Sequence, residues 1–156
     1  MSNGADPSTA NLYSDYGAWK GWTAPFTCDA ETASYYAAEL RGRSLSGASL
    51  LEIGFGNGEF LGWAKQQGAI IHGCEITASA IAAAEEFGLP LIAADFENDP
   101  ALAPESFDII AAFDVFEHLD APTIIAKLAA CSRLLKPGGW LILRFPNGQS
   151  PFGLGP

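Results

Sequence analysis

Hydrophobic and polar positions follow one pattern up to about residue 48 and another pattern after it. Residues 1–48 are aromatic-rich and irregular, whereas later short apolar runs alternate with segments of helical periodicity. The expected strands cover residues 49–53, 70–75, 90–94, 107–113 and 140–145. The expected helices cover about 29–41, 59–67, 78–87 and 121–135. Near-continuous apolar strands alternating with helices are typical of a parallel sheet covered on both faces.

Local signals predict where several of these helices begin and end. Thr77 and Asp120 are expected N-caps, and Gly68 and Gly88 are expected to end the preceding helices. The last helix has one apolar face, formed by Ile124, Leu128, Cys131 and Leu135.

These elements predict an α/β fold with a Rossmann-like, doubly wound and mostly parallel sheet. Right-handed crossovers favour the strand order 3-2-1-4-5, with a ligand crevice where strands one and four diverge. The length suits a single domain over residues 1–156. Within it we expect a cap segment (1–48), a core (49–147) and a tail (148–156).

Four acidic residues stand at or just before the ends of successive expected strands: Glu52, Glu75, Asp95 and Asp114. The carboxyl ends of parallel strands face one crevice, so these side chains are expected to converge there. Acids also follow strands simply as helix N-caps, which is the plainer interpretation of any one of them. Capping cannot explain Glu52, which lies inside an apolar strand, where a buried carboxylate needs a cation or several donors.

The glycine run at residues 54–58 predicts a turn that a nucleotide-like ligand approaches closely. A dinucleotide fingerprint needs a third small residue where Glu59 stands. A pyrophosphate at this helix N-terminus would also meet Glu52 and Glu59. The turn therefore favours a ligand with a sulfonium, an ammonium and a ribose, but no phosphate, over NAD or FAD.

Two further positions fit the nucleoside part of such a ligand. Glu75 lies 17 residues after Gly58, a spacing that suits a carboxylate accepting from both ribose hydroxyls. Asp95 offers an acceptor for an exocyclic adenine amine, and Phe96 offers a flat face against the ring.

Composition narrows the location and the partners. The net charge is −10, with 18 acidic residues against 8 basic ones, which disfavours a nucleic-acid partner. No apolar run reaches the length of a membrane span, and the N-terminus lacks a secretion signal. Three widely spaced cysteines predict reduced thiols rather than disulfides or a zinc site. We expect a cytoplasmic protein.

Five ordered motifs carry a family resemblance: LLEIGFGNGEFL, GCEI, AADFEN, FDIIAAFDVFEHL and LLKPGGWLILRFPN. In order and spacing they resemble the motifs of class I S-adenosylmethionine-dependent methyltransferases, over residues 50–147. The DVFEHL and PNGQSPFG segments are closest to members acting on quinones, sugars and lipid-linked intermediates. The resemblance implies methyl transfer from S-adenosylmethionine to a small-molecule acceptor, with S-adenosylhomocysteine as product.

The resemblance also implies cofactor-binding roles for individual residues. The methionine part would be held by Glu52, Gly54, Gly56 and Asn57, with Phe55 in the same turn. Glu75 would bind the ribose hydroxyls, and Ile76, Asp95 and Phe96 would lie at the adenine. Asp114 would lie near the methionine amino group, and Phe113 would line the pocket.

Three residues near the ends of strands four and five have two interpretations each. His118 is the candidate general base for a hydroxyl acceptor; alternatively it packs against the cofactor or caps the next helix. Glu117 would orient His118 or help hold a metal ion, as in some relatives, although no metal site is otherwise predicted. Arg144 would meet an anionic acceptor or form a salt bridge at the strand end.

Both ends of the chain raise further expectations. Trp19 and Trp22 are candidates for a lid over the cofactor, although aromatic packing against the core is the plainer role. Members of the family normally continue into a helix and a β6–β7 hairpin, which this sequence lacks. Strand five would then be an exposed edge, covered by the missing part of a longer protein, by the tail, or by a partner chain through self-association.

This departure leaves two functions open. The first is a methyltransferase acting on a small molecule, and the second is a cofactor-binding module or fragment without turnover. A nicotinamide-dependent oxidoreductase is a distant third.

Overall fold

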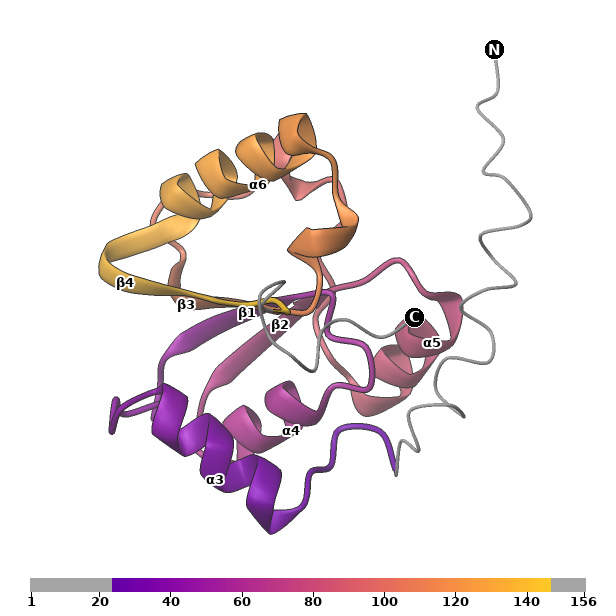
Figure 1. The fold of residues 1–156 in the computed structure, drawn as a ribbon, viewed down its shortest axis with the longest axis vertical. Helices are drawn as coiled ribbons and strands as arrows, with labels where there is room; N and C mark the ends of the chain where they lie inside the picture. Colours follow the sequence, from indigo (N-terminus) through magenta and orange to yellow (C-terminus); the bar gives the residue numbers. More distant parts are fainter. Residues whose placement is uncertain (1–23, 147–156) are drawn as a thin grey trace.

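The computed structural model describes residues 24–146, which form a parallel sheet with helices on both faces (Figure 1). The strands are β1 (Ser49–Ile53), β2 (Ile70–Cys74), β3 (Phe107–Phe113) and β4 (Leu135–Arg144). The α-helices are α3 (Ala30–Glu39), α4 (Glu59–Gln66), α5 (Ala78–Phe87) and α6 (Ala121–Leu134). Two short 3₁₀ helices, η1 (Phe96–Asn98) and η2 (Phe116–His118), follow the segments at which the predicted strands three and four end.

The strand order is β2-β1-β3-β4, and all three pairings are parallel. The expected strand at 90–94 is reduced to one bridge, between Leu91 and Gly73 at the outer side of β2. With this bridge counted, the order is the predicted 3-2-1-4-5, and the predicted fold class is confirmed. The segment does not continue as a strand because the Ala93 carbonyl accepts from the Phe96 N–H and the chain turns into η1.

The sheet separates two parts of the hydrophobic core. Helices α3, α4 and α5 cover one face and α6 covers the other (Figure 1). Neighbouring residues of a strand point to opposite faces, so Leu50 packs into the first part and Leu51 into the second. Cys74 and Cys131 are free thiols in the second part, and burial raises the pKa of each to about 11.

Most of the expected helix boundaries are confirmed. Asp29 and Asp120 cap α3 and α6, accepting from the N–H groups of Thr32 and Thr123 at 2.7 and 2.9 Å. Gly88 ends α5 in the left-handed conformation. Thr77 occupies the N-cap position of α5, but its side chain makes no capping hydrogen bond.

The expected apolar face of α6 is one residue out of register. The buried residues of this helix are Lys127, Ala130, Cys131 and Leu134. Ile124 and Leu128 are only partly buried, and Leu135 already belongs to β4. In this orientation the Lys127 ammonium donates to acceptors inside the protein, at Ala94 and Glu97.

Strand β4 begins five residues earlier than expected and ends at Arg144, so Phe145 lies outside it. A register shift against β3 accommodates the Lys136–Gly139 segment, in which Gly138 has a φ of +76°. In the described part of the chain, β4 pairs on one side only, and no antiparallel hairpin follows it. Trp19, Trp22 and the tail at 148–156 lie outside the described residues.

Candidate functional site

The strand ends are aligned across the sheet. Ile53 pairs with Cys74 and with Ala112, and Ala112 pairs with Leu143. The residues one step beyond this row are Gly54, Glu75, Phe113 and Arg144. The register therefore brings the glycine turn, Glu75, Phe113 and Arg144 together at the carboxyl ends of the strands, called the carboxyl edge of the sheet below. The sequence predicted a ligand crevice at this place.

The glycine turn is a backbone arrangement that larger residues cannot adopt at this place. Gly54 and Gly56 have φ values of +67° and +52°. A Cβ on Gly54 would lie 2.5 Å from Cγ2 of Val115, so a side chain there would collide with the loop after β3. The Gly54 N–H donates to the Cys74 carbonyl at 2.7 Å, which ties the turn to the end of β2.

Glu75 organises the same edge through its carboxylate. One oxygen accepts from the Gly56 N–H at 2.9 Å, and the other accepts from Ile76 and Thr77 at 2.6 and 3.0 Å. The carboxylate thus joins the glycine turn to the two residues that precede α5. Ile76 beside it is 75 % exposed, as a side chain in contact with a ligand would be in the free protein.

Glu52 is buried in the middle strand of this edge, with 4 % of its surface exposed. Burial raises the pKa of its carboxyl group well above the usual range, and the neighbouring carboxylate of Glu75 raises it further. Among the described residues, the Glu52 Oε2 and Asn57 Nδ2 atoms are buried without a hydrogen-bond partner. A third such atom, Nδ1 of His72, lies inside β2 rather than at the edge.

These unpartnered atoms fit the part of the cofactor that the sequence assigned to them. An ammonium group would supply the donor that the Glu52 oxygen lacks, and a carboxylate would supply an acceptor for the Asn57 amide. Buried polar atoms normally have partners, so the pair indicates a place for a polar ligand.

Asp114 and Arg144 form an ion pair at the other end of the edge. Arg144 donates from Nη2 to Asp114 Oδ2 at 2.8 Å and from Nε to Oδ1 at 3.3 Å. Burial lowers the pKa of Arg144, but hydrogen bonds to Asp114 and Tyr35 outweigh it, and the pKa is raised. Of the two interpretations of Arg144, the structure contains the salt bridge.

Asp114 and Phe113 also pack as parts of this edge. Asp114 has a φ of +56°, and its N–H donates to the Arg144 carbonyl at 2.8 Å. The Phe113 ring lies 5.0 Å from the Phe60 ring and 5.0 Å from the Arg144 guanidinium carbon. Phe113 therefore forms a wall between the ion pair and the core.

For three of the predicted cofactor residues, the position of the side chain gives less support to the predicted role. The side chain of Asp95 is exposed at the N-cap of η1 and makes no capping hydrogen bond. The rings of Phe96 and Phe55 are buried in opposite parts of the core, with 0 % and 4 % exposed. With both residues buried, the expected stacking of Phe96 on adenine does not fit this arrangement.

His118 follows β3 in η2, and its side chain is 63 % exposed. It does not cap the next helix, because Asp120 does. Its Nε2 lies 4.0 Å from Glu117 Oε1. In the described part of the chain, no group of three His, Cys, Asp or Glu side chains is placed to hold a metal ion.

A polar hollow of about 400 Å³ lies between α3 and this edge, and the sequence analysis did not predict it. It is lined by Glu31, Thr32, Tyr35, Tyr36, Glu59 and Arg144. Burial, with the nearby Glu52 and Glu59 carboxylates, raises the pKa of Tyr36. The adjacent tyrosines of the predicted first helix were the available signal, but nothing local indicates that this helix lies against the strand ends.

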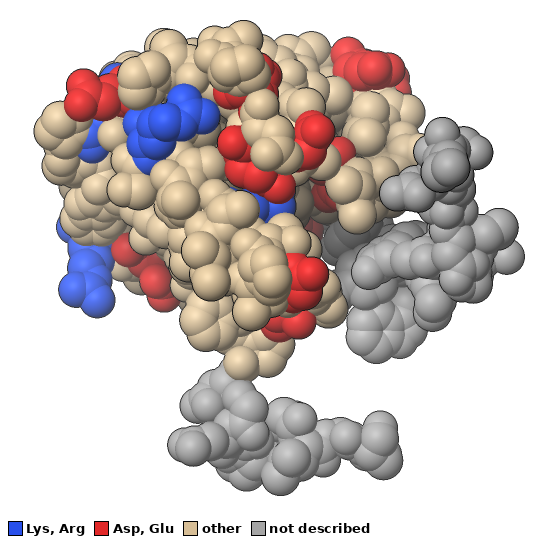
Figure 2. Space-filling view, turned by 90° about the horizontal axis from the view of Figure 1, so that it is seen from above, with Lys and Arg blue, Asp and Glu red and all other residues tan. Residues whose placement is uncertain are grey.

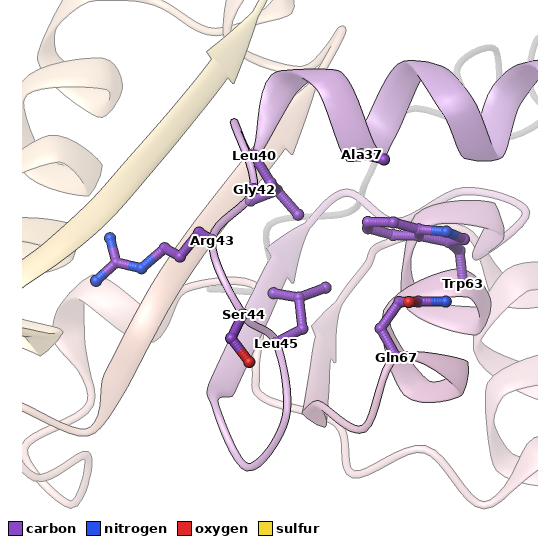
Figure 3. Close-up of a pocket in the computed structure, with 8 residues that line it drawn as sticks. All are labelled: Ala37, Leu40, Gly42, Arg43, Ser44, Leu45, Trp63 and Gln67. Carbon is purple, nitrogen blue, oxygen red and sulfur yellow. The ribbon is translucent and has the colours of Figure 1, made fainter.

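A second hollow, of about 240 Å³, lies near the opposite end of α3 (Figure 3). Leu40, Leu45 and Trp63 form much of its wall, with Gln67 beside them, and the Arg43 guanidinium points away toward β4. It opens near the amino end of β1, away from the acidic residues, so it does not belong to the predicted crevice.

The surface charge agrees with the composition. Viewed from the side of α6, Figure 2 shows acidic groups in several places, with fewer basic groups between them. The described residues contain no helix long and apolar enough to cross a membrane.

Comparison with known sequences gives a matching protein family and several similar proteins. Residues 51–143 match the family described as "Methyltransferase domain". A ubiquinone biosynthesis O-methyltransferase of Paracidovorax citrulli is 32 % identical over 110 residues, which cover 66 % of this chain and 45 % of that protein. Its counterpart in Xylella fastidiosa is 36 % identical over 110 residues, covering 67 % of this chain and 44 % of the relative. The chain thus spans less than half the length of these relatives.

Comparison with solved structures supports the fold. A SAM-dependent methyltransferase from Archaeoglobus fulgidus aligns with a TM-score of 0.68 and 19 % identity, covering 94 % of this chain and 62 % of the other. A SAM-dependent methyltransferase from Thiobacillus denitrificans, in complex with S-adenosylhomocysteine, aligns with a TM-score of 0.57 and 20 % identity, covering 83 % of this chain and 54 % of the other.

Proposed function

Because the chain belongs to the class I S-adenosylmethionine-dependent methyltransferases, we propose that it binds S-adenosylmethionine at the carboxyl edge of its sheet and methylates a small molecule. The family membership confirms the resemblance seen in the sequence. The observation that carries the proposal for this chain is the buried Glu52 carboxyl with an unpartnered oxygen, two residues before the glycine turn. S-adenosylmethionine supplies the activated methyl carbon, and the protein supplies alignment and the exclusion of water.

The residues of the edge divide between the two halves of the cofactor. Glu52 and Asn57 would hold the amino-acid half, with the backbone of Gly54 and Gly56 close to it. Glu75 would exchange some of its backbone hydrogen bonds for the ribose hydroxyls. Ile76 and Asp95 would contact the adenine.

The acceptor is proposed to enter from the hollow between α3 and β4. Arg144 is already paired with Asp114, and the carboxylates of Glu31 and Glu59 line the same hollow. This lining favours a neutral or cationic acceptor over an anionic one. The names of the O-methyltransferase relatives favour a hydroxyl oxygen as the attacked atom.

His118 is proposed as the base for such a hydroxyl, since its ring is exposed to solvent in the short helix that follows β3. Replacement of His118 by Ala should lower turnover without weakening cofactor binding. Unchanged turnover would remove the assignment. The absence of a nucleic-acid partner, self-association and the cytoplasmic location stay predictions from the sequence.

A binding module without turnover remains the second candidate, because the chain spans less than half of the curated relatives. Isothermal titration with S-adenosylhomocysteine, with NAD as the control ligand, tests what both candidates share. Micromolar binding of S-adenosylhomocysteine alone is expected, and absence of binding by a folded chain would contradict the proposal. Product formation from S-adenosylmethionine with a panel of phenols and catechols then separates enzyme from module.

A further inference from the structure

Lys127 is an ionisable side chain placed inside the protein. Glu52 and Lys127 are the charged residues that are buried in the described part of the chain, and Lys127 is 7 % exposed. Removing an ammonium group from water is costly unless it is paired and hydrogen-bonded. Its location on the core-facing side of α6 therefore calls for a reason.

Both hydrogen bonds of the Lys127 ammonium to described residues end on one short segment. Nζ donates to the Ala94 carbonyl at 2.7 Å and to Glu97 Oε2 at 2.7 Å. It also lies 4.6 Å from the centre of the Phe96 ring. In the sequence, Ala94 precedes Asp95, and Phe96 and Glu97 follow it. The side chain of Asp95 itself is exposed.

Around Asp95 itself the backbone hydrogen bonds are local: the Phe96 N–H donates to the Ala93 carbonyl and the Asn98 N–H to the Asp95 carbonyl. The expected strand before it is reduced to a single bridge at Leu91. The carboxylate of Asp95 makes no capping hydrogen bond to η1. The bonds from Lys127, together with the buried Phe96 ring, thus fix where the Asp95 carboxylate stands relative to the sheet edge.

We propose that Lys127 is a positioning residue for adenine recognition: by anchoring Ala94 and Glu97 from α6, it holds Asp95 where it accepts from the adenine amine. This rests on the proposed cofactor site. A buried ion pair adds little net stability compared with well-packed apolar residues, and it fixes one arrangement of the groups it joins. On this segment the fixed arrangement includes Asp95, so the ion pair of Lys127 and Glu97 would serve ligand recognition.

The test compares two ion-paired lysines. Lys127→Met should weaken binding of S-adenosylhomocysteine and of 5′-methylthioadenosine by about tenfold each, the effect of misplacing one charged hydrogen-bond acceptor. Lys136→Met is the matched control, because Lys136 pairs with Asp108 at 2.8 Å near the amino end of β1. It should change both affinities by less than about twofold.

A double-mutant cycle with Asp95→Asn shows whether Lys127 acts through Asp95. If it does, adding Lys127→Met to Asp95→Asn causes little further loss, whereas additive losses would overturn the proposal. Lys127→Arg should restore most of the affinity, and Glu97→Gln replaces Lys127→Met if the latter does not fold. If wild type and variants bound S-adenosylhomocysteine equally well, the role of Lys127 would be refuted and the cofactor site would stand. If the wild type did not bind it, the cofactor site itself would be refuted.

Discussion

The Glu52 side chain connects the stability of the free protein with the binding of its ligand. Burial raises its pKa in the folded chain, whereas the unfolded chain has the ordinary value of a glutamate. The folded state therefore binds this proton more firmly than the unfolded state does. The contribution to stability is full below the unfolded pKa and is lost as the pH rises through the folded pKa.

Replacing Glu52 with Gln tests this linkage. Between the unfolded and the folded pKa, the wild-type free energy of unfolding should fall by up to about 1.4 kcal/mol per pH unit through this one group, and E52Q should lack that slope. The variant should also bind S-adenosylhomocysteine more weakly, because it cannot pair with the ammonium group. Urea unfolding at a series of pH values and calorimetric titration measure the two effects.

Glu85→Gln is the control for the loss of a carboxylate, since Glu85 is exposed on α5. It should keep both the pH dependence and the affinity of the wild type. If E52Q kept the wild-type slope, the buried carboxyl would not be the group that titrates. If it kept the affinity, the assignment of Glu52 to the amino-acid half of the ligand would be wrong.

At the level of single residues, the sequence predicted the acids and missed their partners. Glu52 and Glu75 were identifiable because strand ends follow from local pattern, and parallel strands align those ends. The pairing of Asp114 with Arg144 was one of two open interpretations, since it depends on how β3 and β4 align. Lys127 was missed because it stands beside the predicted apolar face, which was drawn through Ile124 and Cys131.

The element that carries the glycine turn depends on Phe26, which lies far away in the sequence. The Phe26 ring is buried and stacks on the Phe87 ring, with 4.1 Å between the ring centres. The Phe26 backbone has a φ of +59°. Its N–H donates to the Asn57 carbonyl at 2.9 Å. The start of α4 must leave room for Phe26: Gly58 leaves space for its ring, and Gly62 leaves space for its backbone carbonyl.

Two glycines with the same backbone conformation separate strain from packing. Gly58 and Gly42 have φ values of +73° and +74°, but a Cβ would meet the Phe26 ring at 2.3 Å at Gly58 and nothing within 4 Å at Gly42. Both Gly→Ala variants incur the left-handed cost of about 1–2 kcal/mol. Gly58→Ala should lose about 1–3 kcal/mol more in urea unfolding, because of overpacking. Equal losses would mean that Phe26 moves aside without cost.

The elements themselves were predictable to the extent that their signals are local. Gly88 and Asp120 act through their own backbone or through a bond within one turn, and the predictions from them were confirmed. The strand at 90–94 was overpredicted, because only its pairing with β2 decides its length. The burial of Lys127 on α6 was likewise not predictable, because its partner Glu97 lies 30 residues away in the sequence.

On the scale of the whole molecule, the sheet is unequally protected. β1 and β3 have neighbours on both sides, whereas β4 pairs only with β3 in the described part of the chain. Trp140 in β4 and Phe145 just after it are 38 % and 57 % exposed. An edge strand with apolar neighbours is a natural place for another strand to pair.

Hydrogen exchange distinguishes a free edge from a self-associating one. Amides of β1 and β3 should exchange slowest, because they open only when the sheet unfolds, and the outward amides of β4 should exchange much faster. If the chain self-associates through this edge, protection of β4 must rise with protein concentration while that of β1 stays constant. Protection of β4 that is independent of concentration, together with monomeric sedimentation, would reject self-association and leave a covering segment of the same polypeptide as the explanation.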